Sequence, residues 1–405
     1  MKGTLGFVGK RLTEARQSRG LNKTTLSKLI GVVDSQVTKY ESGDQSPSMS
    51  ILDKISSVLR MPIDYFFYER AYDFDVESPV YYRSMSNATQ QQRKAAESRY
   101  VWLHDIFCHL WKFIDFPPAN LPDIEVPNNP EEISRQFIEQ AADDLRRCWG
   151  ISDEPIDNIT RLVENNGIVV SFHDLGADSL DGFSHRNFDR PHIVISTRKA
   201  SAVRIRFSLC HELGHLLLHR NIPKEMLNDA YKFKLIEKQA HQFASAFIFP
   251  QSAFYQEILV PDLTTFRIRK ARWKLSISSM IARAKELKII NEDAEKLLRR
   301  SYGAKRWNRV EPLDDDIAID YPELLKDAFE LVLSERIQSK SSLLDAIPLL
   351  REDIEEIAGL ESGFLQDNIV KLQLRREKLS SPEFSTPKKD SSGSNVVTLI
   401  RPTDA

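Results

Sequence analysis

The stretch Phe207-Ser-Leu-Cys-His-Glu-Leu-Gly-His-Leu-Leu-Leu218 decides how the central part of this chain folds. Its apolar residues surround His211 and His215, which are spaced i and i+4, so on an α-helix both imidazoles point to one face. Glu212 lies about 100° round the helix from His211, within reach of a water on a metal held by that pair. This spacing predicts a hydrolytic zinc site with Glu212 as general base.

A third protein ligand is expected, because catalytic zinc usually takes three and leaves a fourth position for water. The next helical stretch, 235–249, carries Glu237 and His241 at i and i+4. Glu237 is the expected third ligand, as in thermolysin-like sites; the alternative is a solvated charge that pairs with Lys234 or Lys238. His241 is expected to orient a ligand imidazole, and the alternative is a fourth ligand that would close the site.

The other histidines and the cysteine beside the motif are expected to have structural roles. His219 would cap the end of the helix, because cations suit helix C-termini. Cys210 is expected to be a small core residue rather than a ligand. His173, His185 and His192 are expected on strands or at the surface. The ligand types favour zinc over manganese or iron.

Two β-branched runs before the helix predict a small sheet. They are Gly167–Phe172 and His192–Thr197, and the segment 174–190 between them has the composition of a loop or hairpin. An edge strand beside the metal would bind an extended peptide by main-chain hydrogen bonds. The expected fold class is therefore mainly α with a small β-sheet, an α+β architecture.

The composition is globular and limits the function classes. With 405 residues, of which 41% are hydrophobic and 28% charged, the chain has room for two or three domains. A net charge of −2 gives no global nucleic-acid signature, so any DNA binding must come from a local surface. Three cysteines without CxxC spacing fit a reducing compartment, and there is neither a signal pattern nor an apolar run of roughly 18 residues. We expect a cytoplasmic protein without a membrane segment.

Composition shifts divide the chain. We expect a helical domain at 6–70, a helical connector and proline-rich linker at 71–130, the metal-binding domain at 131–260, a helical extension at 261–370 and a disordered tail at 380–405. Apolar residues at helical spacing in 313–370 would dock on the metal-binding domain or on a second protomer, so a homodimer is one alternative.

Residues 6–67 predict a compact unit of about five short helices. A helix, a turn at Gly31 and a second helix over 33–41 form the helix-turn-helix shape, whose second helix enters the major groove of DNA. Over residues 1–45, eight Lys and Arg (2, 10, 11, 16, 19, 23, 28, 39) outnumber four Asp and Glu (14, 34, 41, 44). This local positive excess would attract phosphates.

In the recognition helix we expect Val33, Val37 and Tyr40 to face inward. Asp34 would repel phosphates unless it caps the helix or meets a cytosine amine. The alternative for the whole unit is a dimerisation bundle, or a helix-turn-helix that has lost DNA binding. The polar side chains left outward are the expected DNA contacts: Ser35, Gln36, Thr38 and Lys39.

The chain resembles a fusion of an Xre/Cro-type helix-turn-helix with an ImmA/IrrE-type zinc metallopeptidase of zincin-like fold. The resemblance covers about residues 6–67 and 80–360. Its N-terminal carriers are Arg11–Arg16, Leu26, Gly31-Val32, Val37–Glu41, Gly43 and Pro47. Its peptidase carriers are Tyr82–Ser84, Asp181–Ser184, Arg206-Phe207, His211–His215, His219, Glu237–Ala240, Phe243-Ala244 and Pro250. A C-terminal extension is carried by Arg272-Trp273, Ser276, Arg283-Ala284, Glu311-Pro312 and Tyr321-Pro322.

The resemblance implies a peptidase of narrow specificity whose relatives cut a companion helix-turn-helix repressor and so switch on its genes. It carries over His211, His215 and Glu237 as zinc ligands and Glu212 as general base. Two positions depart from the family. His241 stands where Asn or Asp is usual, and Lys23 stands where Gln is frequent, so we expect Lys23 to contact a phosphate.

The sequence thus predicts a DNA-binding transcriptional regulator with zinc-dependent endopeptidase activity that hydrolyses a peptide bond in a partner repressor. The alternative is a regulator that does not cut and whose zinc domain is a sensor or protein-interaction module. Glu212 favours the enzyme, because a structural zinc site needs no base beside its metal. A third alternative is self-cleavage within the linker region 71–130.

Overall fold

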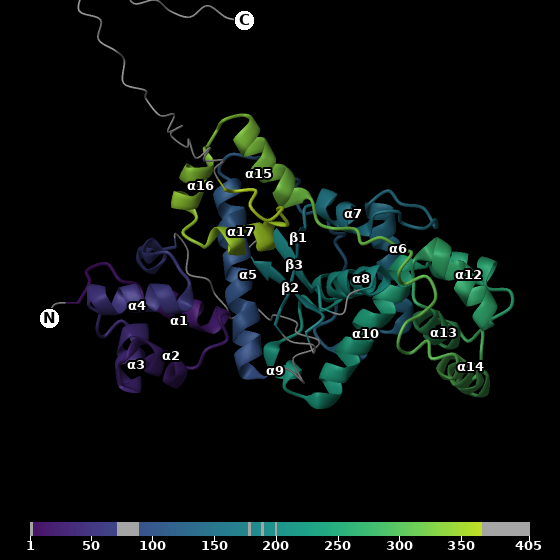
Figure 1. Ribbon diagram of the computed structural model, residues 1–405. Helices are drawn as coiled ribbons and strands as arrows, with labels where there is room; N and C mark the ends of the chain where they lie inside the picture. Colours follow the sequence, from purple (N-terminus) through teal and green to yellow (C-terminus); the bar gives the residue numbers. More distant parts are fainter. Residues whose placement is uncertain (1–2, 71–88, 177–179, 188–189, 199–200, 367–405) are drawn as a thin grey trace, which may run out of the picture. The chain divides into compact units, whose positions relative to one another are not determined.

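The computed structural model describes residues 3–70, 89–176, 180–187, 190–198 and 201–366. The expected tail at 380–405 and the motif Tyr82–Ser84 lie outside these ranges. Within them the chain is mostly helical with one small sheet, as the sequence predicts (Figure 1). Within the described part of the chain, every helix is too short or too polar to cross a bilayer.

The N-terminal helices form the expected helix-turn-helix unit. Gly31, in the left-handed region at φ +75°, ends the helix before the turn, where a side chain would be strained. Buried apolar residues from every helix, among them Leu12, Leu26, Val37 and Leu52, form the core. The elements are α1 (Gly9–Ser18), α2 (Lys23–Ile30), α3 (Asp34–Ser42), α4 (Met49–Leu59) and the 3-10 helix η1 (Ile63–Phe67).

Val33 does not face inward as predicted. It is 65% exposed, whereas Val37 and Tyr40 are buried. The reason is local: Val33 is the N-cap of α3 with extended backbone angles, so it stands outside the helical periodicity that buries the other two. An apolar side chain therefore lies exposed at the start of the recognition helix.

The helix α5 (Gln90–Leu110) connects the N-terminal unit with the sheet. It begins with a capping box, in which Thr89 and Gln92 each bond to the other's backbone N–H. On one side the buried Trp102 indole donates to the Tyr65 hydroxyl (3.1 Å), and Asp105 pairs with Arg11 (3.2 Å). The helix α5 thus packs against both the N-terminal unit and the sheet.

The proline-rich segment at 116–130 packs against the core, although the sequence suggested a spacer. The Trp149 indole donates to the Asn120 carbonyl (2.6 Å), and the Asn221 amide donates to Val126 (3.0 Å). Gly167, at φ +78°, lies so close to Pro118 that a Cβ would come within 2.2 Å of its carbonyl oxygen. Because the proline ring fixes φ, the prolines in this segment lose less conformational entropy when the chain is ordered along a surface.

The sheet has three strands in the order β1-β3-β2, namely β1 (Val169–His173), β2 (Gly182–Asn187) and β3 (Arg190–Ser196). The strand β1 runs parallel to β3, and β2 forms a hairpin with β3 as the composition of 174–190 indicated. All five residues of β1 are buried, as befits a strand covered on both faces. The helix α8 (Ala202–Leu218) packs against β2 and β3.

The helices α8 and α10 (Ala230–Ile248) lie side by side beside the sheet (Figure 1). Gly214 permits this close approach, since a Cβ there would come within 3.0 Å of the Phe243 ring on α10. Phe243 and Phe247 of α10 are fully buried in the same core as Leu213 and Leu217 of α8. The glycine in the histidine motif therefore sets the distance between the two helices.

The remaining helices extend two separate cores. The apolar faces of α12 and α13, with Trp273 and Met280, join the core around α8 and α10, while α15 and α17 pack on α5 and β1. This agrees with the expected docking of the extension on the metal-binding domain. The bounds are η3 (Pro130–Glu132), α6 (Arg135–Cys148), α7 (Ile159–Asn165), α9 (Lys224–Leu227), α11 (Gln251–Glu257), α12 (Leu263–Trp273), α13 (Ile277–Glu286), α14 (Glu292–Ala304), α15 (Leu324–Ser334), α16 (Lys340–Ala346) and α17 (Arg351–Ala358).

Candidate metal centre and DNA-binding surface

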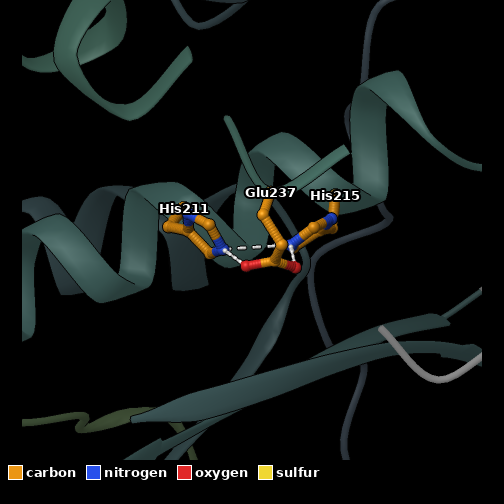
Figure 2. Close-up of side chains that lie close together, drawn as sticks. All are labelled: His211, His215 and Glu237. Carbon is orange, nitrogen blue, oxygen red and sulfur yellow. Dashed lines mark hydrogen bonds and ion pairs between the residues drawn. The ribbon is translucent and has the colours of Figure 1, made fainter. Parts of the chain in front are cut away.

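His211, His215 and Glu237 converge on one point between α8 and α10 (Figure 2). The Nε2 atoms of the two histidines are 3.0 Å apart. The Glu237 carboxylate lies 3.6 Å from His211 Nε2 and 3.4 Å from His215 Nε2. Both imidazoles are buried and the carboxylate is almost so, which makes this a desolvated cluster of donors.

The spacing of these donor atoms fits a zinc ion. Zn–N and Zn–O bonds of about 2.0–2.2 Å at the tetrahedral angle place ligand atoms about 3.3 Å apart. The observed separations of 3.0, 3.4 and 3.6 Å lie around that value. Two imidazoles with one carboxylate are also a donor set that catalytic zinc uses.

Glu212 is buried beside this cluster and is held by the sheet. The Ser184 hydroxyl of β2 donates to Glu212 Oε2 at 2.9 Å. Ser184 stands in the segment Asp181–Ser184, which the sequence marked only by resemblance and without a role. A lone serine in a strand gives no signal of its own, since only the packing of β2 on α8 brings it to the glutamate.

His219 is the C-cap residue of α8, as predicted, but burial disfavours the cationic form that the prediction assumed. Its backbone does follow the last turn of α8, but its side chain is fully buried, and burial lowers its pKa well below the usual range. Its Nδ1 lies 2.9 Å from His215 Nδ1, and its Nε2 lies 3.3 Å from Gln239 Oε1. His215 lies one helical turn before His219 on the same helix, whereas Gln239 comes from α10 and is supplied only by the packing of α10 against α8.

His241 lies beside the cluster of His211, His215 and Glu237, where its ring contacts two other rings. Its ring meets that of His211 nearly edge-on at 4.8 Å between centroids and that of Phe207 at 5.3 Å. Its expected orienting role stays a prediction. Cys210 is fully buried, and burial raises the pKa of its thiol to about 12, so a thiolate ligand is disfavoured as expected.

The three remaining histidines singled out lie on strands, as the sequence indicated, and all are buried. His185 on β2 lies 3.0 Å from the Tyr100 hydroxyl, and His192 on β3 packs edge-on against Tyr100. His173 on β1 contacts the Ser171 hydroxyl at 3.1 Å, and burial lowers its pKa to about 3. His185 and His192 therefore pack against α5, which covers one face of the sheet.

A groove of about 820 Å³ begins one helical turn before the metal cluster. Phe207, four residues before His211 and on the same face of α8, stands in its wall. The first turn of α8, the start of α13 and the segment 302–319 supply the rest of the lining, which mixes serines, charges and aromatic rings. The groove therefore has room and polarity for a stretch of polypeptide.

The polar residues of α3 are placed outward, as expected. Ser35, Thr38 and Lys39 are exposed. Gln36 is half-buried, since its amide bonds to Gln45 and to the Tyr40 hydroxyl, both at 3.0 Å.

Lys23 and Asp34 have protein partners. Lys23 Nζ lies 3.2 Å from the Glu41 carboxylate and 3.5 Å from the Thr38 hydroxyl. The Asp34 carboxylate accepts hydroxyl hydrogen bonds from Ser27 and Thr24 of α2, which hold its pKa below the usual range. Asp34 thus connects α3 with α2 through these hydrogen bonds. Its side chain neither caps α3 nor is left open for a cytosine amine.

Comparisons with known proteins match the N-terminal helices and the region of the His211, His215 and Glu237 cluster to two different families. Residues 12–66 match the helix-turn-helix family, and residues 163–285, which hold β1 to β3, α8 and α10, match the IrrE N-terminal-like domain. The chain combines a helix-turn-helix domain with an IrrE-type peptidase domain. The family resemblance seen in the sequence is therefore confirmed.

Curated relatives match over short segments. A transcriptional regulator in the ATPase CF(0) region of Rhodospirillum rubrum is 43% identical over 60 residues, and an HTH-type transcriptional regulator of Sinorhizobium fredii is 38% identical over 60 residues. An HTH-type transcriptional regulator of Rickettsia conorii is 33% identical over 91 residues. The matches cover 15%, 15% and 22% of this chain and 56%, 42% and 66% of the relatives.

Proposed function

We propose that this protein is a DNA-bound regulator whose IrrE-type domain is a zinc-dependent endopeptidase acting on a partner regulator. The observation that carries the proposal is the convergence of His211, His215 and Glu237 with the buried Glu212 beside them. A purely structural zinc site has no use for a carboxylate that is not a ligand. The short segments shared with curated regulators support a role in transcription.

His211, His215 and Glu237 would hold the ion. Zinc bound there would polarise the scissile carbonyl and lower the pKa of the attacking water. Glu212 would serve as the general base that accepts a proton from the attacking water, and as the acid that returns it to the leaving amine. Ser184 donates to Oε2 of Glu212 and so helps to hold the carboxylate in place.

The substrate would lie extended across the site. In the described sheet β2 is an edge strand, and it carries Ser184 next to the glutamate. Main-chain hydrogen bonds to such an edge fix a peptide without much regard to its sequence. The groove that begins at Phe207 would take the residues on one side of the scissile bond and contribute the selectivity.

The helix-turn-helix domain would bring this site to DNA. Ser35, Thr38 and Lys39 are exposed on α3 for bases and phosphates, and Lys23 lies beside them at the start of α2. Val33 adds an exposed apolar group that suits a thymine methyl. Gln36 must first give up its bond to Gln45 before it can read a base edge.

The direct test mixes the purified chain with helix-turn-helix regulators from the same cell, with zinc or with a chelator, and maps products by mass spectrometry. We expect one partner to be cut at a single peptide bond with zinc only. Glu212→Gln, which keeps size and removes the base, should leave it intact. Intact partners with wild type throughout would instead favour a sensor that does not cut.

A further inference from the structure

We infer that His219 and Gln239 form a relay that holds His215 in the one tautomer able to bind a metal, an inference that rests on the proposed metal centre. The relay is buried and runs from the backbone of η3 through α10 to the end of α8. A ligand imidazole must present an unprotonated nitrogen, and its other nitrogen's partner decides which one that is. The sequence singled out His241 as an orienting residue, which stays a prediction; the residue 2.9 Å from His215 Nδ1 is His219.

The direction of the relay is set by Gln239. Its side-chain nitrogen lies 2.6 Å from the Pro130 carbonyl oxygen and 2.9 Å from that of Ile133. Carbonyl oxygens only accept, so the amide nitrogen must face them and the amide oxygen must face His219. That oxygen, 3.3 Å from His219 Nε2, can only accept as well, so His219 carries a proton on Nε2.

The proton on Nε2 of His219 determines the direction of the hydrogen bond between His219 and His215. His219 is fully buried, and burial disfavours the charged form of an imidazole, so the ring is neutral. A neutral imidazole with its proton on Nε2 accepts at Nδ1. His215 Nδ1, 2.9 Å away, therefore donates, and its Nε2, which lies near His211 Nε2 and the Glu237 carboxylate, carries no proton.

The opposite arrangement would disable the ligand. If His219 donated from Nδ1, His215 would accept there and carry its proton on Nε2, the atom that faces the metal position. The relay thus prepares the site before the ion arrives, and it connects the site with the backbone at 130–133, where the proline-rich segment ends. His219 is a positioning residue, since it touches the ligand and not the reacting atoms.

The first experiment reads the tautomers directly. Full-length protein with ¹⁵N-labelled histidine, freed of metal by a chelator, is examined by NMR for ring-nitrogen shifts and couplings. We expect a proton on Nδ1 of His215 and on Nε2 of His219. A proton on Nε2 of His215 in the wild-type chain would overturn the inference, whatever the protein does to a substrate.

The second experiment measures zinc affinity by competition with a chromophoric chelator. His219→Leu should weaken binding about 10–100-fold, as loss of an outer partner of a metal-bound histidine does. His219→Gln, whose amide oxygen can accept from His215, should recover most of the affinity. His173→Leu removes another buried histidine and should leave affinity unchanged.

The outcomes separate this inference from the proposed function. If wild type fails to bind zinc, the metal centre itself is refuted, while the NMR result still decides the tautomers. If wild type binds zinc and His219→Leu binds equally well, only the relay is refuted. Should His219→Leu fail to fold, Gln239→Leu removes the acceptor at the far end and is expected to weaken zinc binding in the same direction.

Discussion

The metal centre and the DNA-binding surface differ in what fixes their side chains. At the centre, His211, His215 and Glu212 are buried, and defined partners hold them through short bonds. On α3, Ser35, Thr38 and Lys39 stand in solvent. A buried polar group must satisfy its bonds inside the protein, whereas an exposed one exchanges them with water at little cost.

This difference decides for which residues a single structure is enough to assign a functional role. The geometry of the centre is prepared in advance, so each residue there has one role that substitution can test. The geometry of the DNA surface is completed by the DNA, since Lys23 and Gln36 hold protein partners that they would have to exchange. We therefore expect sharp losses at the centre and graded ones on α3.

The largest effect is expected for Glu237→Ala, which removes a proposed ligand. Zinc affinity should fall by more than the roughly 100-fold that an outer partner costs, because a ligand bond is lost outright. DNA affinity, measured by fluorescence anisotropy, should stay the same. Glu225→Ala on α9 changes an exposed glutamate and serves as the matched control. If Glu237→Ala and Glu225→Ala bound zinc equally well, Glu237 would not be a ligand and the proposed metal centre would be refuted.

The next effect compares two carboxyl groups under changing pH. Burial raises the pKa of Glu164, on α7, to about 7, whereas hydroxyl hydrogen bonds lower that of Asp34 on the DNA side. Glu164 binds its proton more tightly in the folded protein than in the unfolded chain, where its pKa is near 4.5. Its contribution to stability is therefore fully present below pH 4.5 and is lost as pH rises through about 7.

Urea unfolding at pH 5 to 9 measures this contribution. Wild type should lose at most about 3 kcal/mol over that range relative to Glu164→Gln. Between pH 5 and 9 the difference between Asp34→Asn and wild type should stay constant, and in the same measurement extended below pH 5 it should disappear as pH falls through the acid range. Parallel stability curves for wild type and Glu164→Gln would mean that the carboxyl is charged in its buried position.

A smaller effect is expected for Ser184→Ala. Loss of one hydrogen bond to a charged group costs about 1.5 kcal/mol, or roughly tenfold, in the cleavage rate. Zinc affinity should not change, because Ser184 contacts the base and not a ligand. Ser184→Thr retains a hydroxyl and should restore much of the rate. A loss of zinc binding in Ser184→Ala would show instead that the serine supports the fold of the site.

The smallest effect is expected on α3. Lys39→Ala should weaken DNA binding a few-fold for every sequence and reduce the slope of log affinity against log salt by about 1. The cleavage of a partner in solution should be unaffected. Lys112→Ala, an exposed lysine outside the helix-turn-helix unit, should leave the slope unchanged. If both variants behave alike, Lys39 does not touch a phosphate.

The site could be predicted from the sequence as far as its parts lie on one element. His211, Glu212 and His215 share a helix, so helical geometry alone places them, and the i and i+4 histidines do face one point. Glu237 required the assumption that the next helix packs against the first. Val33 was misplaced because the periodicity that buries Val37 begins only one residue later.

By itself the sequence determined the helix-turn-helix unit, the two β-branched strands and the convergence of His211 and His215 on one helix face, since these depend on periodicity and local spacing. Only the tertiary structure decided that Gln239 contacts His219 and that Ser184 reaches Glu212, whereas the contact of His219 with His215 follows from their i and i+4 spacing. The physical reason is that hydrogen bonds between distant segments depend on how closely whole elements pack. Here that distance is set by Gly214 against Phe243, a contact that no local pattern contains.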